Sequence, residues 1–285
     1  MPSSRALFRS VLYIPASRPR AMDKARSLDC DAIIFDLEDA VALDEKASAR
    51  EALAAELKAG GYGFRHRIVR INGLESDWGV DDARAVAEMD CDAVLLPKVE
   101  GADLLDRLSE IVGDKPFWAM METSRGILNA LGIADHPAIE GLVIGTNDLA
   151  HELGCATGGD RMAMQMSLQT CLTAARAAGV VCVDGVYNAF RDEEGLLAEC
   201  EQGHALGMDG KTLIHPTQIA PANRVFAPTP DQINLAERQI EAFKEATARG
   251  EGVAVLDGRI VESLHVETAK SVLAKAEAIA EREAA

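Results

Sequence analysis

The chain has 285 residues, of which 48% are hydrophobic and 26% charged, and its formal net charge at pH 7 is −17. This composition is typical of a folded globular protein, and the length suits one large barrel with an appendage or two modest domains. The negative charge would repel nucleic acid and anionic membrane surfaces, so we expect neither as a partner.

Two further absences in the sequence favour a cytoplasmic location. No apolar stretch approaches the roughly 20 residues of a membrane span, and residues 1–13 lack the apolar core of a secretory signal. The six cysteines include no Cys-x-x-Cys pair, which indicates reduced thiols rather than disulfides or a structural metal site.

Eight short apolar runs alternate with stretches of helical periodicity. Such runs are typical of parallel strands buried on both faces, and eight of them predict a closed (β/α)₈ TIM barrel. The predicted strands are residues 10–14, 31–35, 67–71, 92–96, 117–121, 141–144, 179–183 and 211–214. The predicted helices are residues 20–28, 45–58, 81–88, 101–112, 125–132, 164–178 and 193–206.

A short motif recurs before the even-numbered strands. The sequence LDCDAIIFD at residues 28–36 resembles MDCDAVLLP at residues 89–97, and LGMDGK at residues 206–211 is a third version. The repetition indicates that these strands enter the sheet in the same way.

The pattern changes after residue 219. An Ala-Pro-Thr-Pro linker is followed by an amphipathic helix, residues 231–249, for which Asp231 is the expected N-cap. Alternating residues around Asp257-Gly258 predict a β-hairpin, because a type I′ turn needs positive φ angles. A last helix is expected from about His265.

These boundaries predict two parts. Residues 1–226 would form the barrel that carries the active site, and residues 227–285 would form a C-terminal cap of hairpin and helices. The cap is too small to bury a core alone, so we expect it to pack on the barrel or on a neighbouring subunit.

Carboxylates follow two adjacent predicted strands. In a parallel barrel the strand C-termini meet at one mouth, so Glu122 and Asp148 would lie close together. Two carboxylates, with waters and a substrate oxygen, can bind Mg²⁺, and Mn²⁺ is a second candidate ion. The alternative is that each acid is the N-cap of a helix.

Other charged residues also fall at the mouth. Arg70 can bind a carboxylate or carbonyl oxygen through its planar guanidinium, and its alternative role is an ion pair with Asp36. Both are catalytic candidates. Lys98 could be a Schiff-base nucleophile, but an ion-paired lysine is favoured among so many acids. Arg18 and Lys24 are either surface charges or ligands for a phosphate-bearing substrate.

Eight motifs, in order along the chain, resemble those of the citrate lyase β-subunit-like acyl-CoA lyases of the HpcH/HpaI aldolase superfamily, a family that includes malyl-CoA lyases. They are YIPASRP at 13–19, FDLEDAV at 35–41, VRING at 69–73, LPK at 96–98, MET at 121–123, NDL at 147–149, VDG at 183–185 and GKTLIHP at 210–216. The resemblance implies a (β/α)₈ barrel in a homo-oligomer, either a trimer or a hexamer, whose cap lies over a neighbour's active site.

The resemblance also implies a site and a partner. It places Mg²⁺ on Glu122 and Asp148, and substrate on Arg70. The implied partner is a CoA thioester. Its implied contacts are Tyr13, Arg18, Lys24, Asn147, Asp148, Ile214 and His215. Without the resemblance, a lone histidine such as His215 is more often a structural residue.

The chain departs from the lyases after the cap hairpin. The lyases have an aspartate there that handles the proton at the substrate α-carbon in the neighbouring site, whereas alignment places Glu262 at this position. The extra methylene moves the carboxyl by roughly 1 Å, which is enough to alter a positioned step. The change favours water as the group that the acid manages, so Glu262 is a third catalytic candidate.

Hydrolysis of a malyl-CoA-type thioester to malate and CoA is therefore the favoured reaction. Reversible carbon–carbon cleavage of malyl-CoA, citramalyl-CoA or citryl-CoA to acetyl-CoA and a keto acid is the alternative. A class II 2-keto-acid aldolase would share the barrel, metal and arginine but would not need CoA. The full set of metal and arginine positions disfavours a non-catalytic acyl-CoA-binding subunit.

Overall fold

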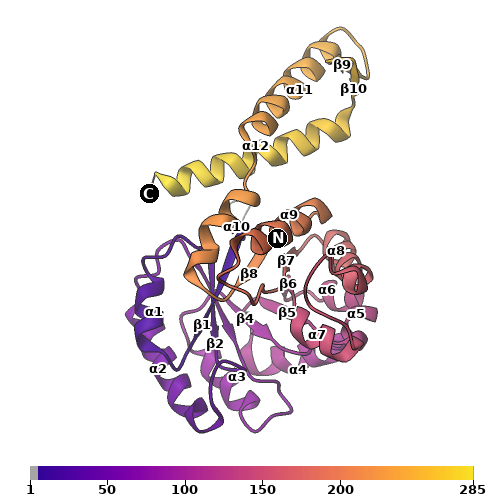
Figure 1. The fold of residues 1–285 in the computed structure, drawn as a ribbon. Helices are drawn as coiled ribbons and strands as arrows, with labels where there is room; N and C mark the ends of the chain where they lie inside the picture. The colour runs from indigo at the N-terminus through magenta and orange to yellow at the C-terminus, as the bar shows by residue number, and fades with distance from the viewer. Residues whose placement is uncertain (1–5, 285) are drawn as a thin grey trace. The chain divides into compact units, whose positions relative to one another are not determined.

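The computed structural model describes residues 6–284, which divide into two compact units. Of the described residues, the first unit contains Phe8–Phe226 and the second contains residues 6–7 and 227–284 (Figure 1).

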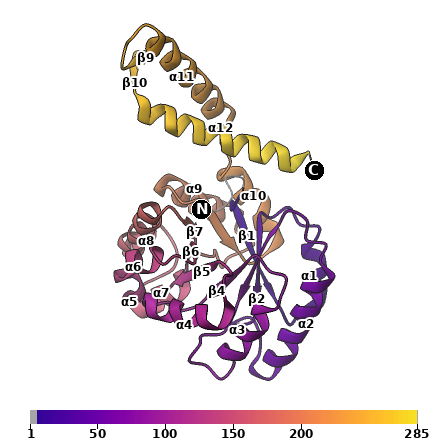
Figure 2. The same ribbon diagram turned by 180° about the vertical axis from the view of Figure 1, so that it is seen from behind.

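The first unit is a closed barrel of eight parallel strands in sequential order, as predicted (Figures 1 and 2). The strands are β1 (Ser10–Pro15), β2 (Ala32–Asp36), β3 (His66–Arg70), β4 (Ala93–Leu96), β5 (Phe117–Met121), β6 (Ile139–Ile144), β7 (Val181–Asp184) and β8 (Gly210–Leu213). Each predicted run overlaps one of these strands, so the (β/α)₈ prediction is confirmed.

Alternating side chains on each strand build two cores, one outside the sheet and one inside the barrel. On β2, Ile33 and Phe35 join the core between strands and helices. Ala32 and Ile34 join the core inside the barrel. All four are fully buried, which explains why the strand is apolar at every position before Asp36.

Helices surround the strands (Figures 1 and 2). They are α1 (Pro19–Ala25), α2 (Lys46–Ala59), α3 (Gly79–Ala87), α4 (Ala102–Val112), α5 (Ser124–Leu128), α6 (Ala130–Ala134), α7 (Thr146–Leu153), α8 (Gln165–Ala178), α9 (Glu193–Leu206) and α10 (Ile219–Val225), with 3₁₀ turns η1 (Leu43–Glu45), η2 (Met162–Met164) and η3 (Pro216–Gln218). Among the described residues, none of the helices is long and apolar enough to cross a bilayer.

Two helix predictions need correction. The helix expected over residues 125–132 is two short helices, because Asn129 ends α5 and begins α6 with a non-helical ψ of 10°. Helix α10 follows the eighth strand, where the sequence pattern predicted no helix.

The recurring motif has a shared structural role. In each copy the aspartate directly before the even-numbered strand accepts a hydrogen bond from a backbone N–H of the preceding strand segment. The N···O distances are 2.7 Å for Arg9–Asp31, 2.7 Å for Arg67–Asp92 and 2.8 Å for Cys182–Asp209. The prediction that these strands enter the sheet in the same way is confirmed.

The second unit contains α11 (Pro230–Ala248), β9 (Ala254–Leu256), β10 (Arg259–Val261) and α12 (Ser263–Glu283). The predicted hairpin is present. Its turn residues Asp257 and Gly258 have φ angles of 51° and 75°, which are the positive values that a type I′ turn requires.

The predicted N-cap of α11 was wrong. Thr229, not Asp231, caps the helix, and its hydroxyl accepts the N–H of Gln232 at 3.2 Å. Pro230 occupies the first helical position, where its missing N–H costs nothing, so the cap falls one residue before it.

Candidate active site

A cavity of about 290 Å³ opens at the C-terminal ends of the barrel strands. The residues predicted for the site that line it are Tyr13, Asp36, Arg70, Glu122, Asn147, Asp148 and Ile214. They come from the ends of different strands, which is how active sites of this fold are assembled.

Four other predicted residues are not among those lining the cavity. Arg18 is the exposed N-cap of α1, and Lys24 lies exposed in the last turn of that helix. His215 follows Ile214 at the end of β8. Glu262 belongs to the second unit, where it is the exposed N-cap of α12.

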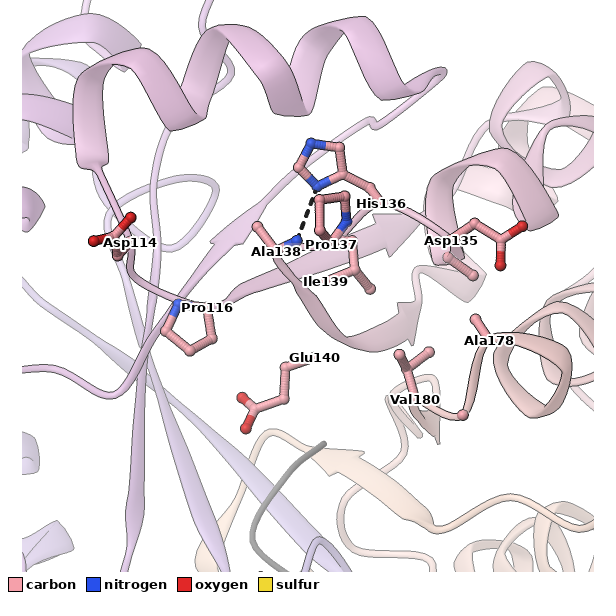
Figure 3. A pocket seen from close by; sticks show the side chains of 12 residues that line it. Asp114, Pro116, Asp135, His136, Pro137, Ala138, Ile139, Glu140, Ala178 and Val180 are labelled. Carbon is pink, nitrogen blue, oxygen red and sulfur yellow. Dashed lines mark hydrogen bonds between the residues drawn. The ribbon is translucent and has the colours of Figure 1, made fainter.

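A second cavity, of about 390 Å³, lies where the chain enters β5, β6 and β7, which is the opposite end of the strands. Figure 3 shows Asp114, Glu140 and Val180 around it, and the hydrogen bond from the Ala138 N–H to His136 Nδ1. Its lining includes acids but neither lysine nor arginine. It is therefore poorly suited to an anionic substrate, and the C-terminal cavity is the better candidate.

Arg70 and Asp36 form a buried, two-point ion pair in the candidate site. They are register partners at the ends of β3 and β2. Arg70 Nε donates to Asp36 Oδ1 at 2.7 Å, and Nη2 donates to Oδ2 at 2.5 Å. Asp36 also accepts the backbone N–H groups of Glu38 and Ala40, at 2.9 and 3.1 Å. With each oxygen accepting two hydrogen bonds, Asp36 is arranged to orient Arg70.

Arg70 remains cationic although it is only 8% exposed. Burial alone would lower the pKa of Arg70, but the charges and hydrogen bonds of its neighbours, with the charge of Asp36 the largest, together outweigh this effect and raise the pKa well above its usual value. The guanidinium also lies 5.0 Å from the ring centroid of Tyr13. Burial raises the pKa of Tyr13 above its usual value, so this residue presents a neutral phenol to the cavity.

Glu38, which no sequence pattern marked as a site residue, is a second buried acid beside Arg70. Its Oε2 lies 2.8 Å from Arg70 Nη1, and the residue is 8% exposed. Burial raises the pKa of Glu38 to about 7, despite the opposing effect of Arg70. The run Asp36-Leu-Glu-Asp39 signalled several acids here, but only the turn after β2 determines which of them are buried.

Glu122 is buried in a negatively charged environment. It is 3% exposed, and burial, followed by the charges of Glu38 and Asp148, raises its pKa to about 8. Its Oε1 accepts the backbone N–H of Lys98 at 2.9 Å. A Cβ at Gly145 would lie 2.5 Å from Glu122 Oε2, so glycine is needed there to leave room for the carboxylate.

Neither Glu122 nor Asp148 is the N-cap of a helix, so the alternative role considered for them is wrong. Thr123, not Glu122, caps α5, and its hydroxyl accepts the N–H of Gly126 at 3.0 Å. Asp148 is the third residue of α7 and lines the cavity.

The donor set fits a magnesium ion. Glu122 and Asp148 offer hard carboxylate oxygens to the same cavity, in a region with excess negative charge. Within residues 6–284 no three acidic, histidine or cysteine side chains are grouped to enclose a metal ion. Two protein ligands would leave the other positions to water and substrate, which suits Mg²⁺ because this ion usually keeps several waters.

Lys98 completes the charge arrangement. Its φ of 52° is in the left-handed region, and its N–H bonds to Glu122. Its ammonium lies 3.7 Å from Glu38 Oε1 and 3.9 Å from Asp148 Oδ1. Burial lowers the pKa of Lys98, but Glu38 and the other acids outweigh this effect and raise it. Such a protonated, ion-paired lysine is not a Schiff-base nucleophile.

The remaining wall of the cavity is held by polar contacts. Asn188 Nδ2 donates to Asn147 Oδ1 at 2.7 Å, and both residues line the cavity. His215 has its Nδ1 2.8 Å from the Thr217 hydroxyl, and its ring stacks on Phe190 at a centroid distance of 4.6 Å. These contacts fix the histidine ring beside the cavity. No sequence pattern had indicated Asn188.

Comparisons with known proteins agree with this architecture. The chain is 61% identical over 273 residues, 96% of each protein, to a (3S)-malyl-CoA thioesterase of Cereibacter sphaeroides strain KD131. It is 34% identical to citrate lyase subunit beta of Escherichia coli K12, covering 94% of this chain and 93% of that protein.

A solved structure and a family model extend the comparison. The CitE protein of Mycobacterium tuberculosis, in complex with magnesium, acetoacetate and coenzyme A, superposes with a TM-score of 0.80 at 30% identity, covering 96% of this chain and 99% of that one. The model of the HpcH/HpaI aldolase/citrate lyase family matches residues 9–216. The chain therefore belongs to the HpcH/HpaI aldolase/citrate lyase family.

Proposed function

We propose that this protein hydrolyses a malyl-CoA-type thioester to malate and CoA in a Mg²⁺-dependent reaction. The observation that carries the proposal is the 61% identity, over 96% of both chains, to a (3S)-malyl-CoA thioesterase. The magnesium and coenzyme A bound to the similar CitE protein support the same cofactor and the same kind of ligand. Mn²⁺ would be an alternative ion, and a cytoplasmic location would suit such a substrate.

In this reaction the oxygen of water bonds to the thioester carbonyl carbon, the C–S bond breaks, and CoA leaves as the thiol. Arg70 would bind an anionic or carbonyl oxygen of the substrate, held in position by Asp36. Bound at Glu122 and Asp148, Mg²⁺ would act as a Lewis acid on a substrate oxygen.

We assign Glu262 as the general base. Its carboxylate would accept the proton of the attacking water, and it would do so in the site of a neighbouring subunit. Glu262 is exposed, and its N–H donates to His265 Nδ1 at 3.0 Å, which fixes the start of α12. A carboxylate at a fixed helix start is suited to a role that needs accurate placement.

The CoA part of the substrate would use the basic residues near β1. Arg18 and Lys24 are exposed on one short helix, and we assign them to the CoA phosphates. Tyr13, Asn147, Ile214 and His215 would contact the rest of the thioester.

The test is to incubate the protein with malyl-CoA and Mg²⁺ and to measure four products. Hydrolysis would yield malate and free CoA thiol in equal amounts. Carbon–carbon cleavage would yield glyoxylate and acetyl-CoA without free thiol, and the 34% identity to citrate lyase subunit beta keeps this as the second candidate. Glyoxylate without malate would overturn the proposal. Turnover of a free keto acid without CoA would instead indicate an aldolase.

A further inference from the structure

One buried side chain connects the ends of β7 and β8. Gln218, the last residue of η3, is 0% exposed. Its Oε1 accepts the backbone N–H groups of Ile214 and His215, at 2.9 and 3.2 Å. Its Nε2 donates to the carbonyl of Tyr187 at 2.9 Å. A single amide group thus makes three hydrogen bonds to two separate segments.

Both segments form the wall of the candidate active-site cavity. Ile214 lines it directly, and Tyr187 lies between Val186 and Asn188, which also line it. Strand β7 ends at Asp184 and β8 ends at Leu213, so these wall residues lie beyond the hydrogen-bonded ladder of the sheet. Side chains must therefore supply much of the support for this wall.

A second buried residue holds the start of the β7 segment. Lys211 on β8 is 0% exposed, and its Nζ donates to the carbonyl of Gly185 at 2.5 Å. The segment after β7 is thus fixed at Gly185 by Lys211 and at Tyr187 by Gln218. Its far end is held by the hydrogen bond from Asn188 to Asn147.

The chemistry of this position requires an amide. Two N–H groups need an acceptor and one carbonyl needs a donor, and glutamine offers both functions on one side chain. A carboxylate at the same place would still accept from Ile214 and His215, but it would have no proton for the carbonyl of Tyr187.

We propose that Gln218 is a positioning residue that fixes the wall made by Val186, Asn188 and Ile214, and thereby sets the affinity for substrate. This inference rests on the proposed function. The chemical groups at Arg70 and Glu122 have other partners, namely Asp36 and the N–H of Lys98. Loss of Gln218 should therefore weaken binding of the thioester while leaving the chemical step largely intact.

The test compares Gln218→Met, which removes all three hydrogen bonds, with Gln218→Glu, which keeps the two accepted ones. Asn223→Leu is the control. Asn223 is 9% exposed, and its amide bonds to Ser10 Oγ and to the carbonyl of Asp29, both at 2.7 Å, at the start of β1 and before β2. The Asn223→Leu substitution therefore removes a comparable buried amide at the end of the barrel away from the cavity.

For Gln218→Met we expect KM for malyl-CoA to rise about tenfold while kcat stays within about threefold of wild type. Gln218→Glu should give an intermediate KM, and this variant keeps the test informative if Gln218→Met does not fold. Asn223→Leu should lower the unfolding temperature without changing KM. Calorimetric titration with CoA should show the same order of affinities.

Two results would overturn the inference. One is a KM and a CoA affinity within about twofold of wild type in both Gln218 variants, with only the unfolding temperature reduced. The other is a fall in kcat at unchanged KM. If the wild-type protein does not turn over malyl-CoA, the proposed function fails, and the inference about Gln218 is then decided by CoA affinity alone. If the wild-type protein does not bind CoA, both the proposed function and the inference about Gln218 are wrong.

Discussion

At the residue scale, the site depends on Arg70, which is charged although it is almost completely buried. The partner that makes this tolerable is Asp36, which is 1% exposed and is itself saturated with hydrogen bonds. Removing one member of such a pair leaves the other charge buried and uncompensated. Stability and substrate binding should therefore respond together to changes at Asp36.

We predict that Asp36→Asn destabilises the fold by about 3 kcal/mol and reduces kcat/KM much more than kcat at saturation, because a less well oriented Arg70 binds substrate poorly. Chemical denaturation and steady-state kinetics measure the two effects. Asp39→Asn is the control, since Asp39 Oδ2 lies 3.9 Å from Arg70 Nη1 and the side chain of Asp39 is 63% exposed. Equal effects from both variants would contradict the special role of Asp36.

The metal proposal gives a second prediction. Glu122→Gln or Asp148→Asn should abolish Mg²⁺-dependent turnover and also remove the rise in unfolding temperature that Mg²⁺ produces by binding the native state. Asp135→Asn, in the cavity at the other end of the barrel, should keep both responses. Turnover that survives excess chelator would eliminate the metal from the mechanism.

The sequence could predict the pairing of Asp36 with Arg70 because adjacent strand ends place them in register. It could not identify Glu38 or Gln218. Their roles depend on the paths of the segments that follow β2 and β8, which no periodic pattern encodes. Burial of a polar side chain in such a segment becomes visible only once the packing around it is known.

At the element scale, the repeated aspartates link neighbouring strands through hydrogen bonds. Asp92 accepts the N–H of Arg67 at 2.7 Å and also two hydrogen bonds from its guanidinium, at 3.0 and 2.9 Å. The repeated motif predicted equivalent strand entries, but it did not reveal the arginines. Arg67 precedes the motif by more than 20 residues, so the pairing depends on strand register rather than on local sequence.

We predict that Asp92→Asn lowers the free energy of unfolding at pH 7 by about 2 kcal/mol, a typical value for hydrogen bonds to a charged group. Burial alone would raise the pKa of Asp92, but the hydrogen bonds from Arg67 outweigh this effect and lower it. The carboxylate therefore stabilises the fold above its unfolded pKa of about 4, and this contribution is lost as the pH falls through the lower folded value.

Denaturation curves at several pH values provide the measurement. The difference in the free energy of unfolding between wild type and Asp92→Asn should reach its largest value at pH 7 and should shrink below about pH 4. Asp90→Asn is a matched control, because Asp90 also bonds to Arg67, at 2.8 Å, but is 69% exposed. It should cost less than about 1 kcal/mol. A difference for Asp92→Asn that does not vary with pH would contradict this account.

At the scale of the whole molecule, the second unit leaves apolar surface without cover. Its small core consists of Ala246, Ala254, Val261 and Val266, with partly buried neighbours. Around the hairpin, Val255, Ile260 and Leu264 are 71%, 62% and 60% exposed. Apolar side chains grouped on so small a unit favour association, which supports our proposal that this part packs on a neighbouring subunit.

Mixing two inactive variants tests that proposal. Glu122→Gln disables the barrel part of a site, and Glu262→Gln disables the acid that we assign to the cap, so each protein alone should hydrolyse malyl-CoA poorly. If the cap acts in a neighbour's site, mixed oligomers formed after mild dissociation and reassembly will contain sites in which both groups are intact.

Equal mixing should restore about one quarter of wild-type activity, because half of the barrels and half of the caps are intact and they combine at random in a symmetric assembly. Intact-mass analysis of the reassembled oligomers shows whether subunits have exchanged. Exchange without recovery would place Glu262 in the site of its own chain or outside the mechanism. Full activity of the Glu262→Gln protein before mixing would show that Glu262 has no part in the mechanism. The reason is that the amide keeps the size of the side chain and lacks only the base.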